Sequence, residues 1–197
     1  MKLKEYIRIN KTDCPEGCKF KNKNDLSIVL VPPPVNPKIL LISRDPTLDF
    51  LSLYEYSRHY NLQERRRVLF AAGIPRLLIL QITRFLGRRD IKDFYRIFEI
   101  AYWTHFHKCP TDEKNKFTTI CANRWLKKEI NNAKVDRIQT IVCLGKDVEN
   151  WVKSNIPNNI KIINLPHPSG RSHKWNNKDD AKILEAIKEL LHVCRED

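Results

Sequence analysis

One stretch near the front of the chain decides the fold: Lys38-Ile-Leu-Leu-Ile-Ser-Arg-Asp-Pro-Thr47. Its first half is a short apolar run typical of a buried strand, and its second half is a turn in which Asp45 precedes a proline. The same pattern returns near the end in Asn164-Leu-Pro-His-Pro-Ser-Gly-Arg171, with His167 as the ionisable residue. In an open α/β sheet, residues just past the carboxyl ends of strands face the ligand crevice. We therefore predict that Asp45 and His167 lie in one pocket.

Strand and helix patterns alternate along the rest of the chain. The four prolines between residues 31 and 37 exclude a helix there. Strands are expected at residues 39–42, 98–106, 138–144 and 160–165. Helices are expected within residues 51–96, with breaks at Gly73 and Gly87, and over 117–134, 147–155 and 179–194. This order predicts a three-layer α/β/α fold with a central, mostly parallel four-stranded sheet. We expect one domain over residues 1–197, with the segment 1–25 packed on it.

The chain is strongly basic, because 36 Lys and Arg residues against 23 Asp and Glu residues give a formal net charge of +13. A surplus of this size favours a polyanionic partner, and nucleic acid before a membrane, since no basic amphipathic anchor is evident. No run reaches about 18 uninterrupted apolar residues, and the N-terminus lacks the hydrophobic core of a signal peptide. We therefore expect a cytoplasmic, monomeric protein that binds nucleic acid.

Four of the six cysteines group in two separated segments: Cys14, Cys18, Cys109 and Cys121. In a reducing compartment such a set indicates a metal site rather than a disulfide framework. Four thiolates suit either a [4Fe–4S] cluster or tetrahedral zinc, and the spacing alone leaves both open. The other two, Cys143 and Cys194, are expected to fill the core.

Five motifs follow one another between residues 38 and 171: Leu41-Ile-Ser-Arg-Asp-Pro-Thr47, Tyr102-Trp-Thr-His-Phe-His-Lys-Cys109, Cys121-Ala-Asn-Arg-Trp-Leu-Lys-Lys-Glu129, Ile141-Val-Cys-Leu-Gly145 and Leu165-Pro-His-Pro-Ser-Gly170. Their order resembles the uracil-DNA glycosylase superfamily, above all its iron–sulfur family 4 branch. The resemblance implies a glycosylase-like fold and a monofunctional DNA glycosylase that removes uracil or a related damaged pyrimidine in base excision repair. It also favours the [4Fe–4S] cluster over zinc at the four grouped cysteines.

The chain departs from the family 4 pattern at four places, one of which is a Cys109–Cys121 interval that is shorter than the family's. The first motif reads Ser-Arg-Asp-Pro-Thr instead of Gly-Glu-Ala-Pro-Gly, which is closer to the Asp-Pro of the family 1 enzymes. His105 stands where the family has an asparagine that reads uracil, and the first cysteine pair is one residue wider than the usual Cys-x-x-Cys. Two other functions therefore stay open: excision of a different modified base, and nucleic-acid binding without catalysis.

Asp45 and His167 suit the two charges that develop when an N-glycosidic bond breaks. A carboxylate stabilises the positive charge on the sugar, and a hydrogen-bond donor stabilises the negative charge on the departing base. Asp45 would also orient the attacking water. The structural alternatives are an Asp45 that caps the turn and a His167 whose ring is satisfied by backbone. No lysine stands in a catalytic motif, so a Schiff-base lyase is not indicated.

Two further sets of residues are expected to contact the substrate. The base contacts are Arg44, Thr47, Phe70 and His105. The DNA contacts are Ser169, Arg171, His173 and Lys174, in a basic loop where Trp175 would stack on DNA. The resemblance places Phe70 as the ring that stacks on the flipped base, although a core role is the alternative. It places Arg171 as the side chain that fills the gap left in the duplex by the flipped base, with a solvated loop as the alternative. It places Thr47 where the size of the side chain decides whether a 5-methyl group on the base is admitted.

Overall fold

The computed structural model describes residues 31–87, 92–110, 119–135, 138–156, 159–169 and 172–195. Three predicted site residues, Cys14, Cys18 and Arg171, lie outside these ranges, as does the N-terminal segment 1–25. The predictions that concern them are therefore carried forward as predictions.

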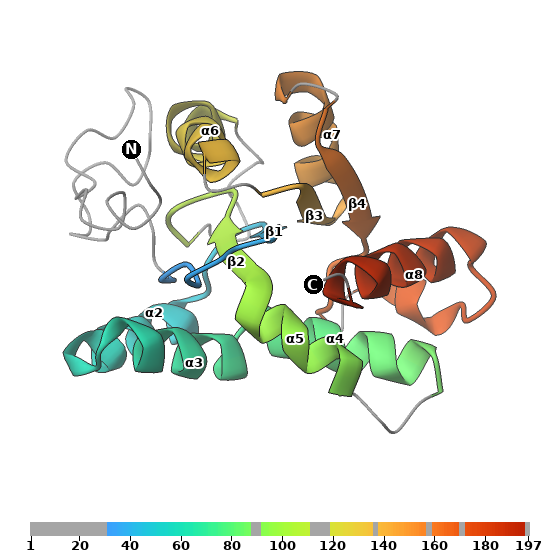
Figure 1. Cartoon of the computed structure of the whole chain (residues 1–197), viewed down its shortest axis with the longest axis horizontal. Helices are drawn as coiled ribbons and strands as arrows, with labels where there is room; N and C mark the ends of the chain where they lie inside the picture. Colours follow the sequence, from blue (N-terminus) through green and yellow to red (C-terminus); the bar gives the residue numbers. More distant parts are fainter. Residues whose placement is uncertain are drawn as a thin grey trace.

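A four-stranded, wholly parallel sheet forms the centre of the molecule (Figure 1). Its strands are β1 (Ile39–Ser43), β2 (Ala101–His105), β3 (Thr140–Leu144) and β4 (Lys161–Leu165), in the order β2-β1-β3-β4. Every residue of β1, β2 and β3 is buried, whereas β4 at the edge is buried only in part. Burial on both faces explains why β1 and β3 read as unbroken apolar runs.

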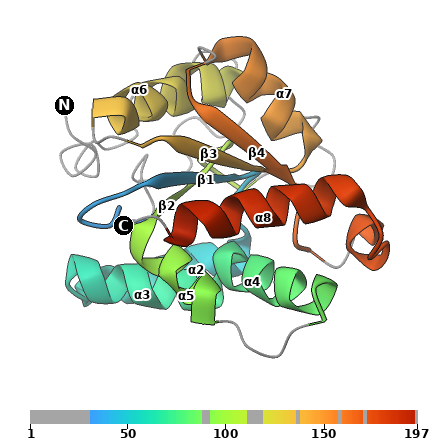
Figure 2. The same ribbon diagram turned by 45° about the vertical axis from the view of Figure 1, so that its right-hand side comes forward.

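Helices cover both faces of the sheet, as Figure 2 shows. One face carries α2 (Leu48–Tyr56), α3 (Leu62–Ala72), α4 (Ile74–Phe85), α5 (Lys92–Ile100) and α8 (Ala181–Arg195). The other face carries α6 (Lys127–Val135) and α7 (Lys146–Asn155). The predicted three-layer α/β/α fold with a four-stranded parallel sheet is thus confirmed.

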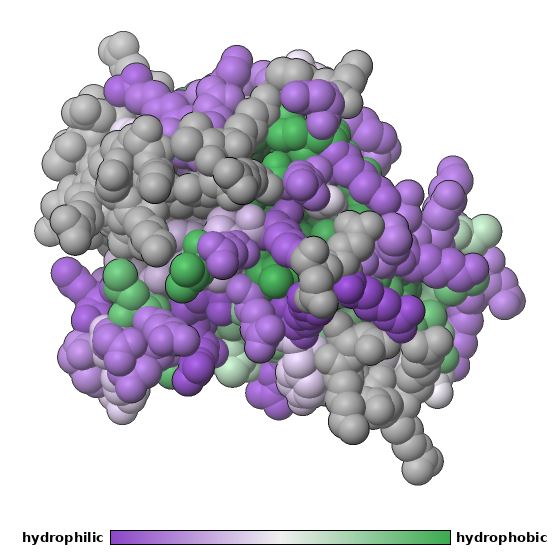
Figure 3. Space-filling view, in the orientation of Figure 1, coloured by the Kyte–Doolittle hydropathy of each residue, from purple (hydrophilic) through white to green (hydrophobic). Residues whose placement is uncertain are grey.

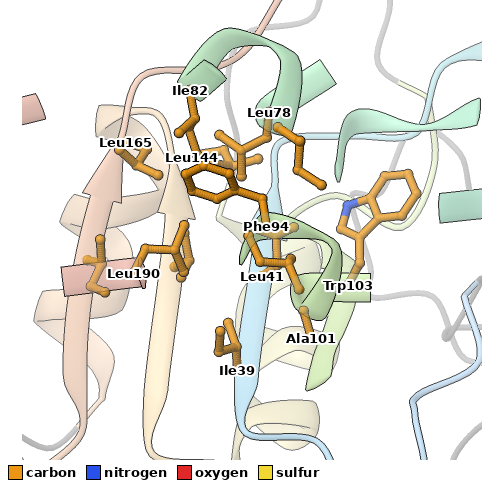
Figure 4. Close-up of a cluster of buried hydrophobic side chains, with 14 of the residues drawn as sticks. Ile39, Leu41, Leu78, Ile82, Phe94, Ala101, Trp103, Leu144, Leu165 and Leu190 are labelled. Atoms are coloured by element: carbon orange, nitrogen blue, oxygen red, sulfur yellow. The ribbon is translucent and has the colours of Figure 1, made fainter. Parts of the chain in front are cut away.

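Two hydrophobic clusters fill the space between the layers. Alternate residues of a strand point to opposite faces, so Ile39 and Leu41 enter one cluster while Leu40 and Ile42 enter the other. Figure 4 shows Ile39 and Leu41 in the first cluster, beside side chains of α4, α5 and α8. The described part of the molecular face in Figure 3 is mostly hydrophilic, in keeping with an apolar interior.

Two boundaries differ from the expected ones. The strand expected over residues 98–106 begins only at Ala101, because α5 continues to Ile100. Phe94, Ile97 and Ile100 are all buried, and their spacing of three is that of a helical stripe, which the apolar sequence hides. The helix expected over 117–134 is also divided, since a π-helical turn, Ala122–Leu126, precedes α6.

Gly73 joins α3 to α4 and makes room for a neighbouring indole. A Cβ atom there would lie 2.7 Å from the Leu69 carbonyl oxygen and closer still to the Trp103 ring. The Trp103 Nε1–H group donates to Ser43 Oγ at 2.9 Å, so the glycine allows Trp103 to reach the end of β1. Of the described helices, none is by itself long and apolar enough to cross a membrane. Together, α3 and α4 reach the required length and apolar composition, but the pair is bent by 46°.

Candidate active site

Asp45 and His167 lie at the same edge of the sheet, each two residues past the end of its strand. Their electrostatic interaction reflects this proximity. Burial lowers the pKa of His167 below its ordinary value, the Asp45 carboxylate opposes that shift, and the Arg44 guanidinium adds to it. A carboxylate, a guanidinium and a mostly neutral imidazole therefore share one site.

The proton of neutral His167 can be assigned from the hydrogen bonds of its ring. The backbone N–H of Ser169 donates to His167 Nδ1 at 3.3 Å, and Ser169 Oγ lies 3.0 Å from the same nitrogen. A backbone N–H group can only donate, so Nδ1 accepts and the neutral ring carries its proton on Nε2. His167 thus keeps an N–H donor at Nε2, while half-buried Ser169 holds the other side of the ring.

The turn after β1 is ordered by its own residues. Asp45 is half-buried, and its Oδ1 lies 3.9 Å from Nε of the more exposed Arg44. Thr47, itself exposed, caps α2, because its Oγ1 accepts from the backbone N–H of Phe50 at 3.1 Å. Since Pro46 between them is buried and fixes φ, the turn presents Asp45 from a restricted backbone.

His105 ends β2 directly beside Ser43 of β1 and is 2% exposed. Its ring centroid lies 4.8 Å from that of Trp103 and 5.3 Å from that of Phe50. Burial, with a smaller contribution from Lys108, lowers the pKa of His105 well below its ordinary value. His105 is therefore a neutral imidazole, with one nitrogen that donates and one that accepts.

Phe70 lies in the hydrophobic core and is fully buried. Its ring packs 5.7 Å from Phe98 and 5.8 Å from Trp103 between centroids, and the Arg66 guanidinium carbon lies 4.3 Å from its centroid. These contacts correspond to the core alternative. Sequence reasoning missed Phe50, the aromatic ring that lies beside His105.

Sequence reasoning also missed His107, a second histidine beside the Asp45 turn. Its backbone N–H donates to the Arg44 carbonyl oxygen at 2.8 Å, next to a matching bond from Phe106 to Ser43. Burial lowers the pKa of His107 to about 4, with Asp45 opposing that shift. His107 lies two residues past the end of β2, as Asp45 does past β1 and His167 past β4, and this position after a strand is the signal that could have found it.

Of the predicted DNA-contacting residues, His173 and Lys174 are exposed on η3, a short helical turn over His173–Asn176. Trp175 on the same turn is 4% exposed and packs against Phe85. The expectation that Trp175 stacks on DNA is therefore wrong for the structure described, because its ring lies in the core.

Comparison with known families decides what kind of chain this is: the model of the Uracil DNA glycosylase superfamily matches residues 31–191. The chain belongs to that superfamily. Members of the superfamily are generally glycosylases, hydrolases that act on DNA. A search of curated proteins finds no significant match.

This uracil DNA glycosylase superfamily chain brings two of its candidate metal ligands close together. Cys109 and Cys121 are buried, and the backbone N–H of Lys108 donates to Cys121 Sγ at 3.3 Å. Donation to sulfur suits a thiolate that binds a metal and is one way in which proteins tune iron–sulfur clusters. The described residues contain no group of three or more potential metal ligands, so a full set would need Cys14 and Cys18. Cys143 and Cys194 are buried in the core, as predicted.

A buried ion pair between Lys108 and Glu129 adjoins the cysteine pair, since Lys108 precedes Cys109 and its backbone contacts Cys121. Lys108 Nζ also donates to Thr104 Oγ1 at 2.7 Å. Glu129 accepts from the Tyr102 hydroxyl at 2.7 Å and from Thr104 Oγ1 at 3.0 Å. The Lys-Cys motif and the cysteine-bearing helix, which the sequence presents as separate matches, are thus joined by two charges that satisfy each other.

The π-helical turn explains how one helix reaches both ends of Lys108. Cys121 meets the Lys108 backbone and Glu129 meets its side chain. On a regular α-helix, residues eight apart lie about 80° apart around the axis. A π turn takes up one extra residue, so eight positions span about two full turns and both side chains share one face.

Breaking this pair should destabilise the fold. Glu129→Gln should lower the free energy of unfolding by about 3–5 kcal/mol, because it leaves the Lys108 ammonium buried without its counter-charge. The double variant Lys108→Met/Glu129→Leu should recover much of that loss in urea denaturation. As a control, Glu189→Gln removes an exposed pair with Lys161 and should cost no more than about 1 kcal/mol. A double variant no more stable than Glu129→Gln would contradict this account.

Proposed function

We propose that this chain is a monofunctional DNA glycosylase that hydrolyses the N-glycosidic bond of uracil or a related damaged pyrimidine in base excision repair. The observation that carries the proposal is the pairing of the Asp45 carboxylate with a His167 ring whose Nε2–H is available for donation. Membership of a superfamily of DNA-acting hydrolases supports it.

In this proposal Asp45 and His167 act on opposite sides of the bond that breaks. The Asp45 carboxylate stabilises the cationic sugar and orients the water that attacks it. His167 Nε2–H donates to the base carbonyl oxygen that gathers negative charge, which lowers the barrier to departure of the base. Direct attack by water needs no lysine nucleophile, and the reaction therefore stops at the abasic site.

A neutral His167 suits this role because its two nitrogens have separate tasks. Nδ1 accepts from Ser169, so a second proton could enter only at Nδ1 and would break that bond. Burial lowers the pKa of His167, which keeps the ring in its neutral form near pH 7. The proposed donor is thus already oriented before the base arrives, and no reorganisation is needed during reaction.

The base would be read by Arg44, Thr47 and His105, whereas Phe70, predicted to stack on the base, lies in the core. Neutral His105 can donate and accept, as an asparagine amide does, but from a ring of different geometry. This substitution favours a second candidate function, the excision of a different modified base. A panel of oligonucleotides with substituted pyrimidines separates the two candidates, since both require Asp45 and His167.

The DNA itself would be held by Ser169, Arg171, His173 and Lys174, together with the general positive charge of the chain. Exposure of His173 and Lys174 next to the His167 turn supports this arrangement. We propose a cytoplasmic monomer.

Removal of either proposed catalytic group should slow chemistry far more than binding. His167→Ala should lower the single-turnover excision rate by about 10²–10³, the usual loss for one oxyanion-type donor. Asp45→Asn should be similarly severe, because an amide cannot offset cationic charge. The test uses a labelled uracil-containing oligonucleotide, excess enzyme and alkaline cleavage, with the exposed residues His192→Ala and Asp179→Asn as controls. Near-wild-type rates for both site variants would refute the assignment.

The pH dependence of the same rate reports the protonation state of His167. Since its pKa in the fold lies below the ordinary value of 6.5, the neutral form is dominant above that pH. The rate should therefore stay level from about pH 7 to 8 and fall only in acid, where the imidazole takes up a proton. A rate that instead declines as pH rises through about 6.5 would mean that imidazolium is the active form.

Cys14, Cys18, Cys109 and Cys121 are proposed to bind one [4Fe–4S] cluster, which would brace the DNA-binding fold and takes no part in the hydrolysis. Burial of Cys109 and Cys121 and the donor at Cys121 Sγ support the proposal. Purified protein should be brown with broad visible absorption, and Cys121→Ser should lose colour and iron. Cys194→Ser, a change at a buried thiol outside the set, should keep both. Colourless protein with one zinc per chain would contradict the cluster assignment and indicate a zinc site.

A further inference from the structure

The turn that carries His167 is held by two side chains from other elements. Trp175 Nε1–H, in η3, donates to the His167 carbonyl oxygen at 3.1 Å. Gln81 Nε2–H, in α4, donates to the next carbonyl oxygen, that of Pro168, at 3.2 Å. Two consecutive carbonyl groups of the turn are thus fixed from outside, at the residue proposed to act on the base.

The Trp175 bond is one that the fold requires. Trp175 is 4% exposed, and its ring packs edge-on against Phe85 of α4, with centroids 6.1 Å apart. A buried indole N–H group needs an acceptor, and here that acceptor belongs to His167. Gln81 lies on the same helix as Phe85, so one helix supports both the indole and the turn.

The imidazole therefore receives its position from three directions. Ser169 holds Nδ1 from within the turn, while Trp175 and Gln81 hold the main chain from η3 and α4. With the ring and its backbone both fixed, the direction of the Nε2–H bond is fixed as well. Catalysis is sensitive to such placement, since an error of about 1 Å can cost about 10² in rate.

We propose that Trp175 and Gln81 are positioning residues that aim His167 Nε2–H at the departing base. Neither touches the base; each acts through the backbone of the His167 turn. The inference rests on the proposed glycosylase function, and it adds two residues from outside the motif.

The η3 turn also explains why DNA contact and positioning can lie so close together. Successive residues of a 3-10 helix are about 120° apart around its axis. His173 and Lys174 can therefore be exposed to solvent while Trp175 points into the core. Lys174, which is proposed to contact DNA phosphate, is thus the immediate neighbour of Trp175, which holds the His167 turn.

The test is a double-mutant cycle on the single-turnover excision rate of the full chain with a uracil-containing oligonucleotide. Trp175→Phe keeps an aromatic ring and removes the N–H donor together with part of the indole volume, and Gln81→Met keeps the length of the side chain without its amide. Each should lower the rate by about tenfold and change the dissociation constant for DNA by less than about threefold. In a His167→Ala background, neither should lower the rate further, because no imidazole is left to aim.

The matched control is Trp151→Phe. Trp151 is also buried, at 5% exposure, and its Nε1–H group donates to Asn123 Oδ1 at 2.8 Å on the other face of the sheet. This variant loses an equivalent bond and should lose stability, yet its excision rate should stay within about twofold of wild type.

Each outcome has a distinct meaning. A full rate for Trp175→Phe and Gln81→Met, with a slow His167→Ala, overturns the positioning role and leaves the proposed function intact. An equal loss in the His167→Ala background, or an equal loss in Trp151→Phe, shows general damage and also overturns it. A full rate for His167→Ala would remove the role assigned to His167, and the inference with it, while absence of excision by the wild-type chain would remove the proposed function itself. If Trp175→Phe fails to fold, Gln81→Met completes the same cycle.

Discussion

Parallel pairing of β1 with both of its neighbours is the constraint on which the site depends. In the pairing of β1 with β2, Ser43 lies beside His105. In the pairing of β1 with β3, Ile39 lies beside Thr140. Because every strand runs the same way, the turns that follow them meet at one edge, although they are more than 100 residues apart in the chain. The connection from β1 leads to β2 on one side, and the connection from β3 leads to β4 on the other. This is the topological switch point at which open α/β sheets bind ligands.

Burial at that edge of the sheet keeps the three histidine side chains there in their neutral form. Loss of solvent lowers the pKa of His105, His107 and His167, even though Asp45 raises the pKa of the last two. The nearest interior cation, Lys108, is matched by Glu129. The Asp45 carboxylate, with the more exposed Arg44 beside it, can stabilise a cationic sugar, whereas an uncompensated buried ammonium at this edge would oppose it. The buried pair therefore protects the electrostatics of the site as well as joining β2 to the cysteine-bearing helix.

Local patterns were sufficient to predict the sheet and the turns that carry Asp45 and His167. They failed where a residue's role depends on distant partners. The strand boundary at Ala101 was missed because Phe98 continues an apolar run that a strand and a buried helix share. The choice between Phe50 and Phe70 depends on which ring reaches His105, and only the packing of α2 against β2 decides it. The Lys108–Glu129 pair likewise joins residues 21 apart, through a π turn that no propensity predicts.

The position of each strand in the sheet explains why the turns that carry Asp45 and His167 are built so differently. β1 is central, with a strand on either side, and its turn is held by a buried proline, the Thr47 cap and the backbone N–H groups of Phe106 and His107 from the segment after β2. β4 is an edge strand that pairs with β3 on one side, and among the described residues no strand pairs with its outer side. The His167 turn compensates with side-chain donors from elsewhere, Trp175 and Gln81. In the sequence, Trp175 stands among polar residues and therefore resembles a DNA-stacking residue. Its actual partners are Phe85 of α4 and the His167 carbonyl oxygen after β4, which lie far from it in the chain or outside its polar loop. The turn after this edge strand is thus anchored by residues from η3 and α4, and those anchors are not visible in the motif that carries His167.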